Sequence, residues 1–202
     1  MRILALALLT TVTFLNAQTK FQFIALDDCN DISAWKTFQS AGVVVSDHLD
    51  DGDVGGALRF DVAFTKGSGY GGVTRNFNIP LPENYELTFS LRATVPVNNF
   101  EVKISNDSSG QDIWWVNTKN FIYPTQWKKF VVKKRHLSFA WGPHPAPSPD
   151  TLRRLELVVT AGSGGSGRVW IDNVELRALP LPPTKISPPT VSASSPFGKN
   201  VT

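Results

Sequence analysis

Apolar residues in the middle of the chain alternate with polar ones, or form short β-branched and aromatic runs bounded by Gly, Pro, Asn and Asp. A period of two is typical of β-strands, and almost no stretch has the 3.6-residue period of an amphipathic helix. Only one helical turn is expected, near Asp31–Trp35. The pattern predicts ten strands, at 21–25, 43–47, 57–64, 71–77, 85–94, 100–105, 113–116, 128–133, 154–160 and 168–176.

Short strands at this spacing predict an all-β fold, either a two-sheet antiparallel sandwich or a barrel. A parallel sheet would need helical crossovers, for which the intervening segments leave no room. Those segments are rich in Gly, Asp, Asn and Ser, as expected of turns. They include residues 50–53, 66–69, 106–110 and 162–167.

Three of the predicted strands have one apolar and one polar face, namely 85–94, 100–105 and 154–160. A sandwich sheet with a solvated outer face has this alternation. We therefore expect a single polar sheet face, which carries Arg92, Glu101, Lys103 and Glu156.

The two ends of the chain differ in composition from the middle. Arg2 precedes an uncharged apolar stretch at 3–15 and then Asn16-Ala17, which is the layout of a secretory signal peptide. The stretch is shorter than the roughly 20 residues that span a bilayer. The Pro- and Ser-rich residues 178–202 predict a linker and the start of a truncated next module. We expect a domain at 18–177, secreted or periplasmic after cleavage near Ala17, with covalently linked downstream domains.

Composition argues against several function classes. The net charge of +3 is too small for a nucleic-acid-binding protein, and no second apolar stretch is long enough to span a membrane. Cys29 is the only cysteine, which excludes an intrachain disulfide and a cysteine-based zinc site. The chain has no Gly-x-Ser-x-Gly elbow and no Walker motif.

Three segments together carry a resemblance to a known family. They are Leu26-Asp27-Asp28 with Trp35, the run Gly55–Phe60, and the closing strand Val169–Leu176, which reads VWIDNVEL. They resemble the galactose-binding-like jelly-roll domains, which include carbohydrate-binding modules such as those of family 11. The resemblance implies a two-sheet jelly-roll sandwich over about residues 21–177. Residues 191–195 are similar to the opening of a discoidin-type domain.

The resemblance also implies structural Ca²⁺, which many members of the family bind. Asp27 and Asp28 leave the first predicted strand and Asp172 lies on the last, and these strands are often neighbours in a jelly roll. Calcium takes six to eight oxygen ligands, so the three carboxylates are candidate ligands. The alternative is that Asp27, Asp28 and Asn30 only form turns and an N-cap.

Sugar binding needs planar aromatic faces and polar side chains that bond to hydroxyl groups. Trp114 and Trp115 are adjacent on a strand, so they must face opposite ways. Trp141 is expected in a loop that four prolines stiffen, where it could serve as a platform. The three tryptophans and the polar residues Arg92, Glu101, Lys103 and Glu156 form a candidate ligand-binding set. The alternative interpretation is that the charged residues form a lattice of cross-strand salt bridges.

These features favour a non-catalytic carbohydrate-binding module of a secreted multidomain protein, accessory to a glycoside hydrolase. One alternative is a structural or interaction sandwich that binds no sugar. A second alternative is a glycosidase that uses Glu101 and Glu156 as its carboxylate pair. Lys103 and Arg92 nearby would keep both carboxylates ionised, which disfavours the protonated acid that a glycosidase needs.

Overall fold

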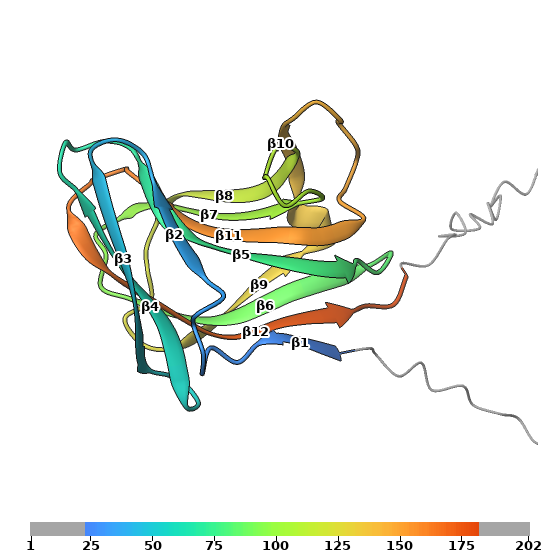
Figure 1. Ribbon diagram of the computed structural model, residues 1–202, viewed down its shortest axis with the longest axis horizontal. Helices are drawn as coiled ribbons and strands as arrows, with labels where there is room; N and C mark the ends of the chain where they lie inside the picture. The colour runs from blue at the N-terminus through green and yellow to red at the C-terminus, as the bar shows by residue number, and fades with distance from the viewer. Residues whose placement is uncertain (1–22, 182–202) are drawn as a thin grey trace, which may run out of the picture.

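The computed structural model describes residues 23–181, which fold into two antiparallel sheets that face each other (Figure 1). The strands are β1 (Phe23–Asp27), β2 (Lys36–Gln39), β3 (Val43–Asp51), β4 (Gly56–Phe64), β5 (Tyr70–Pro80), β6 (Tyr85–Ala93), β7 (Asn98–Ser105), β8 (Ile113–Phe121), β9 (Lys128–Lys133), β10 (Ser138–Trp141), β11 (Thr151–Thr160) and β12 (Ser166–Ala178). A single 3₁₀ turn, Lys134–His136, follows β9 in this part of the chain.

All ten predicted strands are present, and the all-β two-sheet sandwich is confirmed. Two four-residue strands, β2 and β10, were not expected. The helical turn expected near Asp31–Trp35 is a hydrogen-bonded turn instead, in which the Trp35 amide donates to the Ile32 carbonyl at 2.9 Å. No helix in residues 23–181 is long or apolar enough to cross a membrane. The predicted signal peptide, most of the linker and residues 191–195 lie outside the described residues.

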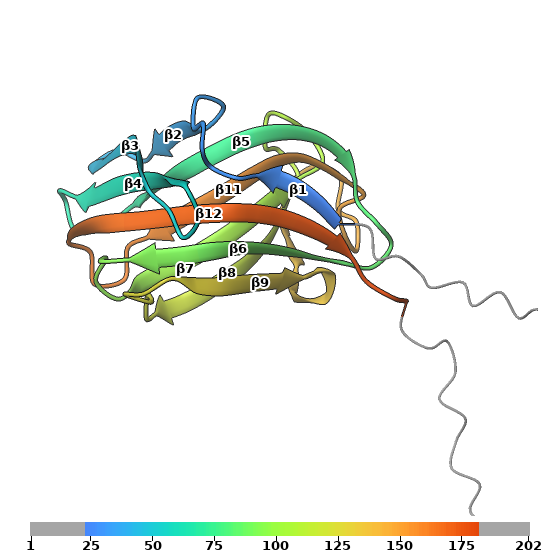
Figure 2. The same ribbon diagram turned by 90° about the horizontal axis from the view of Figure 1, so that it is seen from below.

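Sheet A has the order β3-β4-β12-β6-β9, with β1 also paired to β12, and sheet B has the order β10-β8-β7-β11-β5-β2. Figure 2 shows β12 running along the middle of sheet A between β4, β6 and β1. The start of β1 and the end of β12 lie side by side, with Phe23 opposite Arg177. Both ends of the described chain therefore leave from the same end of the sandwich (Figure 1).

The core fills the space between the sheets with the apolar faces of the alternating strands. Leu87, Phe89 and Leu91 of β6 face inward from sheet A, while Val102 and Ile104 of β7 face inward from sheet B. Each of these side chains is at most 1% exposed, and burying one contributes roughly 1.5–3 kcal/mol. Polar residues at the intervening positions are thereby directed to the outer faces.

A bulge in β12 marks the point where this strand changes partners. Ile171 is the last residue that pairs with β4, and Val174 is the first that pairs with β1. Asn173 between them has φ 50°, a left-handed conformation that Asn adopts more readily than most residues. The bulge places Asp172 at the junction of β12 with the loop 52–55.

The expected single polar face is wrong for Arg92. Strand β6 pairs with β12 and β9 in sheet A, whereas β7 and β11 pair with each other in sheet B. The alternation on each strand was read correctly, but Arg92 and Glu101 lie on opposite outer faces of the sandwich. Alternation within one strand says nothing about which sheet the strand joins.

Candidate ligand-binding site

The register of sheet B aligns its outward polar residues in two rows. Lys103 on β7 lies between Trp115 on β8 and Glu156 on β11, and Glu156 in turn opposes Thr74 on β5. The neighbouring row contains Asn117, Glu101, Val158 and Gly72. Adjacent side chains within a row are cross-strand neighbours close enough to interact. Trp115, Lys103 and Glu156 of the first row and Glu101 of the second form the floor of a groove.

Aromatic side chains stand at both sides of this floor. Trp115 and Trp141 meet edge to face at one side, with ring centroids 5.6 Å apart, and Phe38 and Tyr70 stand at the other. The groove has a volume of about 420 Å³. Trp141 lies at the end of β10, an edge strand, and not in a loop as expected. It is 45% exposed, so its indole is available to a ligand.

A buried ion pair lies at the centre of the floor. The Lys103 ammonium is 2.9 Å from Glu101 Oε2, and it lies 5.3 Å from the ring centroid of Trp141 and 5.7 Å from that of Tyr70. Glu101 Oε1 accepts hydrogen bonds from Thr160 Oγ1 and Asn117 Nδ2. Glu101 and Lys103 are only 4% and 7% exposed, so the expectation of a fully solvated face is wrong. The rings above the pair screen it from water.

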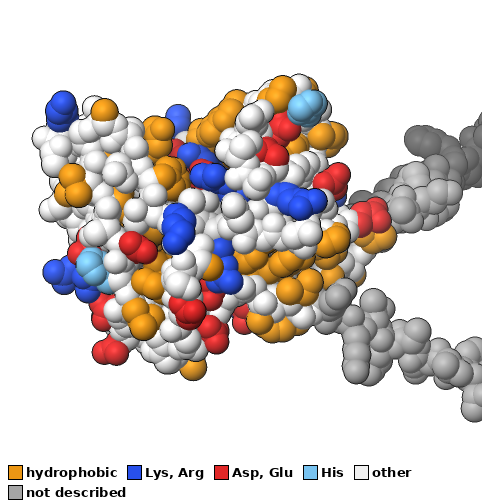
Figure 3. Space-filling model, viewed as in Figure 1, with side chains coloured by type: hydrophobic (Ala, Val, Ile, Leu, Met, Phe, Trp, Pro, Cys, Tyr) orange, Lys and Arg blue, Asp and Glu red, His pale blue; other side chains and the backbone are white. Residues whose placement is uncertain are grey.

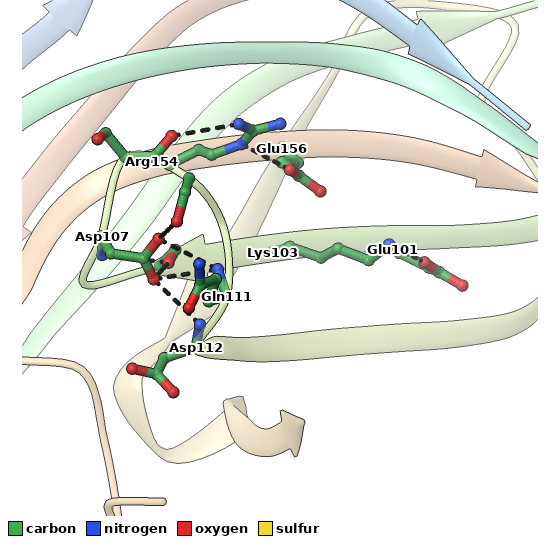
Figure 4. A network of polar contacts seen from close by, with 10 residues as sticks. Glu101, Lys103, Asp107, Gln111, Asp112, Arg154 and Glu156 are labelled. Carbon is green, nitrogen blue, oxygen red and sulfur yellow. Dashed lines mark hydrogen bonds and ion pairs between the residues drawn. The ribbon is translucent and has the colours of Figure 1, made fainter. Parts of the chain in front are cut away.

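A second ion pair joins the floor to the loop at 106–112. Arg154 Nε lies 2.7 Å from Glu156 Oε1, and Arg154 Nη1 donates to the carbonyl of Ser108 (Figure 4). Asp107 is the hub of this loop, because its carboxylate accepts from the hydroxyls of Ser105 and Ser109 and from the amides of Gln111 and Asp112. Desolvation alone would raise the pKa of Asp107, but these hydrogen bonds hold it well below its ordinary value.

The structure brings five of the seven predicted ligand-binding residues to this groove: Glu101, Lys103, Trp115, Trp141 and Glu156. Trp114 faces the core, where it is 1% exposed and its Nε1 donates to the carbonyl of Ala146. The opposite orientation of the two adjacent tryptophans is thus confirmed. Arg92 lies on sheet A, stacked between Trp127 and Trp170.

Seven residues that line the groove were not predicted from the sequence: Phe38, Tyr70, Ser109, Gly110, Ile113, Arg154 and Thr160. Arg154 and Thr160 could have been found, because they share the strand of Glu156 and lie an even number of residues from it. Phe38 gave no comparable signal, since it lies on a four-residue strand without alternation.

Within each of the two ion pairs the positive and the negative charge cancel, so the groove carries no net charge from them. What remains is a set of fixed donors and acceptors beside exposed aromatic rings, which suits a neutral polar ligand with an apolar face. Both carboxylates are paired with a cation, Glu101 with Lys103 and Glu156 with Arg154. Figure 3 shows basic and acidic side chains interspersed over the visible face, with no large area of one sign.

A larger hollow of about 630 Å³ lies at the free edge of β9. Its lining is mainly apolar, with Phe121, Ile122, Tyr123 and Phe130, and the side chains around it include no carboxylate and no amide. It therefore offers a sugar few acceptors for its hydroxyl groups.

The three predicted calcium ligands are not gathered together. Asp27 is engaged by Arg75, by Trp35 Nε1 at 2.6 Å and by the Cys29 amide, and Asp28 is exposed. Asp172 is fully buried and accepts from the amides of Val54 and Asn173. Its Oδ2 and the Gly56 carbonyl both lie against Gly52, where a Cβ would be 2.8 Å from Oδ2. Asp172 thus keeps a buried carboxylate without a cation partner among residues 23–181, whereas Asp27 is already paired with Arg75. No three acidic, His or Cys side chains in this part of the chain converge as a metal site would require.

These observations define a jelly-roll sandwich with a polar, aromatic-walled groove on one sheet. No protein-family model matches the chain, and no curated protein is similar to it in sequence. Solved structures do match. The family 11 carbohydrate-binding module of the cellulosomal cellulase Lic26A-Cel5E of Clostridium thermocellum is 16% identical, with a TM-score of 0.60 over 78% of this chain and 95% of that one.

Two further structures agree. A family 11 module from Clostridium thermocellum in complex with a β-1,3-1,4-mixed-linked tetrasaccharide is 15% identical, with a TM-score of 0.60 over 76% of this chain and 94% of that one. The solution structure of CtCBM11 is 14% identical, with a TM-score of 0.58 over 81% and 99% of the two chains. The chain thus has the jelly-roll fold of family 11 carbohydrate-binding modules.

Proposed function

We propose that this chain is a non-catalytic carbohydrate-binding module and that the groove on sheet B holds the sugar. The observation that carries the proposal is the half-exposed indole of Trp141 beside a floor of nearly buried, already oriented polar groups. Ligand sites typically combine such aromatic walls with a few fixed polar groups. The fold shared with carbohydrate-binding modules supports the same function.

The side chains divide the work of binding. The apolar face of a sugar ring packs on Trp141, while Glu101 and Glu156 accept hydrogen bonds from hydroxyl groups and Lys103 and Arg154 donate them. Because the ion pairs already hold these groups in place, little side-chain entropy is lost when the ligand binds.

Affinity electrophoresis of the mature chain in gels that contain β-glucan, xylan or galactan tests this function. At least one polysaccharide is expected to retard the protein. Trp141→Ala should relieve the retardation, whereas Phe23→Ala, which removes a 51% exposed aromatic ring on β1, should not. If no gel in a broad panel retards the protein, a structural role for the sandwich becomes the better interpretation.

The ion pairs in the groove argue against a glycosidase. A glycosidase needs two carboxyl groups that are free to act on the glycosidic bond, whereas Glu101 is engaged by Lys103 and Glu156 by Arg154. We expect no release of reducing sugar from any polysaccharide that the protein binds, even at high protein concentration. Release that disappears in Glu156→Gln would overturn the non-catalytic assignment.

In the full protein, the module would hold linked domains, such as a glycoside hydrolase, close to their polysaccharide and raise their effective concentration there. This role presupposes export, with cleavage of the signal peptide near Ala17. N-terminal sequencing of the protein recovered from the culture medium of a secreting host tests the cleavage. An intact Met1 on the exported chain would contradict it.

We also propose that Asp172 contributes to a structural Ca²⁺ site, because its carboxylate is fully buried and no cation pairs with it among the described residues. A ligand that binds only the folded state raises the melting temperature. Millimolar Ca²⁺ is expected to raise the melting temperature of the wild type by several degrees and that of Asp172→Asn by much less. Identical melting curves in the presence of Ca²⁺ and of a chelator would contradict the calcium site.

A further inference from the structure

The outer face of sheet A carries a row of alternating cations and indoles. Arg92 on β6 opposes Trp170 on β12, Trp170 opposes Arg59 on β4, and Arg59 opposes His48 on β3. On its other side, Arg92 meets Trp127, which directly precedes β9. The centre of the Arg92 guanidinium lies 4.5 Å from the ring centroid of Trp170 and 4.9 Å from that of Trp127. The guanidinium is thus stacked between two indoles.

The two arginines beside Trp170 differ in their partners. The Arg59 guanidinium is held by Asp50 at 2.8 Å and by Asp61 at 2.9 Å. Among residues 23–181, Arg92 has neither a hydrogen-bond acceptor nor an ion-pair partner, and its Nε is buried without one. Nη1 and Nη2 are not among the buried unpaired atoms, so they reach the surface. Arg92 is therefore a permanently charged guanidinium whose terminal N–H groups face outward, and no acceptor among the described residues binds them.

The nearby carboxylates already have other partners. Asp50 accepts from Trp170 Nε1 as well as from Arg59, and Asp53 accepts from the hydroxyl of Ser90. Glu175 is paired with Lys129. None of them is in contact with Arg92, although Ser90 and Arg92 share one face of β6.

We propose that Arg92 is the centre of a second binding site, which takes the oxyanion group of an acidic sugar, either a uronate carboxylate or a sulfate ester. A planar guanidinium binds such groups through two parallel, charge-assisted hydrogen bonds. The guanidinium lies over both indoles, and the partly exposed Trp127 offers a surface for the sugar ring. The inference that the ligand carries an oxyanion group comes from Arg92 alone. The inference that this group belongs to a sugar rests on the proposed function. The groove on sheet B, whose charges cancel, takes the neutral ligand.

Titration of ¹⁵N-labelled wild-type protein, observed at its indole N–H signals, tests this site. The probes are a glucuronate-containing oligosaccharide, a neutral oligosaccharide of the same length, and sodium sulfate. The acidic sugar and sulfate are expected to shift the signals of Trp127 and Trp170, and added salt should weaken both effects. A neutral sugar that binds the groove should shift Trp115 and Trp141 instead.

Variants then assign the effect to one guanidinium. Arg92→Gln should weaken binding of the acidic probe by at least about tenfold, because it removes the charge-assisted pair. Arg153→Gln, which deletes the same charge from an exposed site on β11, should leave the affinity unchanged. Arg92→Lys keeps the charge but loses the fork, so it should bind at an intermediate strength.

The outcomes separate this site from the groove. If the oxyanion probes leave Trp127 and Trp170 unshifted in the wild type, or if Arg92→Gln binds as well as Arg153→Gln, the second site is wrong, whatever the groove does. A response to sulfate without a response to the glucuronate probe excludes the uronate carboxylate as the ligand group, and a sulfated oligosaccharide must then shift the same signals if the site binds a sugar. A protein that binds acidic probes at Arg92 but retains no neutral sugar keeps this site and loses the groove function.

Discussion

The two outer faces of the sandwich use the same residue types in different ways. Sheet B places Trp115 and Trp141 above ion pairs that are complete within the sheet, and the rings and strands leave a groove between them. Sheet A stacks Arg92 between Trp127 and Trp170, so the indoles cover a cation and not a hollow. One face has paired charges and free aromatic surface, and the other has an unpaired charge and largely covered aromatic surface.

The difference shows that composition does not identify a binding face by itself. A tryptophan beside an arginine on an outward strand position can be a platform for a ligand or part of the packing. Exposure decides between the two, since Trp141 is 45% exposed and Trp170 only 7%. The pairing of the neighbouring charges then decides whether a neutral or an anionic ligand fits.

The largest expected effect is on stability, from Trp170→Ala. This substitution removes a nearly buried indole, its stacking on Arg92 and the hydrogen bond from Nε1 to Asp50, so we expect a loss of about 3–5 kcal/mol in the free energy of unfolding. Trp141→Ala should cost less than about 1 kcal/mol, because its ring is half in solvent. Urea denaturation of the two variants measures the contrast. Equal losses would mean that Trp141 is also a packing residue.

Sequence reasoning located most of the fold because alternation is a local signal. β6, β7 and β11 each direct every second side chain into the core, and the inward positions on all three strands were assigned correctly. Strands β2 and β10 were missed because four residues are too few to show a period. The jelly-roll topology came from the resemblance of the closing strand, not from the alternation.

The site was harder to predict because it depends on pairings between distant strands. Arg92 was placed with Glu101 although β6 and β7 enter different sheets, and no pattern within either strand contains that information. The burial of Glu101 and Lys103 was also missed. It results from Tyr70 and Trp141, which reach the groove from β5 and β10, far away in the sequence.

The second largest expected effect on stability comes from the buried ion pair Glu101–Lys103 of sheet B. Glu101→Gln leaves the Lys103 ammonium with a neutral partner at a site of 7% exposure, so we expect a loss of about 3 kcal/mol. Glu175→Gln on sheet A breaks a pair with Lys129, whose side chain is 52% exposed, and should cost at most about 1 kcal/mol. Thermal or urea unfolding compares them. A smaller loss for Glu101→Gln than for Glu175→Gln would contradict the difference in burial between the faces.

A smaller loss is expected from Asp107→Asn. The carboxylate organises the loop beside Arg154, and an amide can accept at only one of the two oxygens it replaces, so we expect a loss of about 1–2 kcal/mol. Asp31→Asn is a matched control, because Asp31 is exposed and accepts only from the amide of Ser33. Hydrogen exchange at the amides of Gln111 and Asp112 should accelerate in the first variant alone. Unchanged protection there would mean that Arg154 holds the loop without Asp107.

The smallest effect is a pH dependence on sheet A. Hydrogen bonds from Arg59 and Trp170 lower the pKa of Asp50 to about 2. The pKa is lower in the folded state than the value of about 3.9 in the unfolded chain, so the stabilisation is complete above about pH 4 and is lost as the pH falls towards 2. The pair is partly exposed to solvent, which limits the contribution to at most about 1 kcal/mol. Unfolding free energies measured from pH 5 to about pH 2 should therefore fall less steeply in Asp50→Asn than in the wild type.

Because Trp170 also stacks on Arg92, protonation of Asp50 should shift the indole signal of Trp170 and leave that of Trp141 on the other sheet unchanged. Identical slopes in the two proteins would show that Arg59 is held mainly by Asp61.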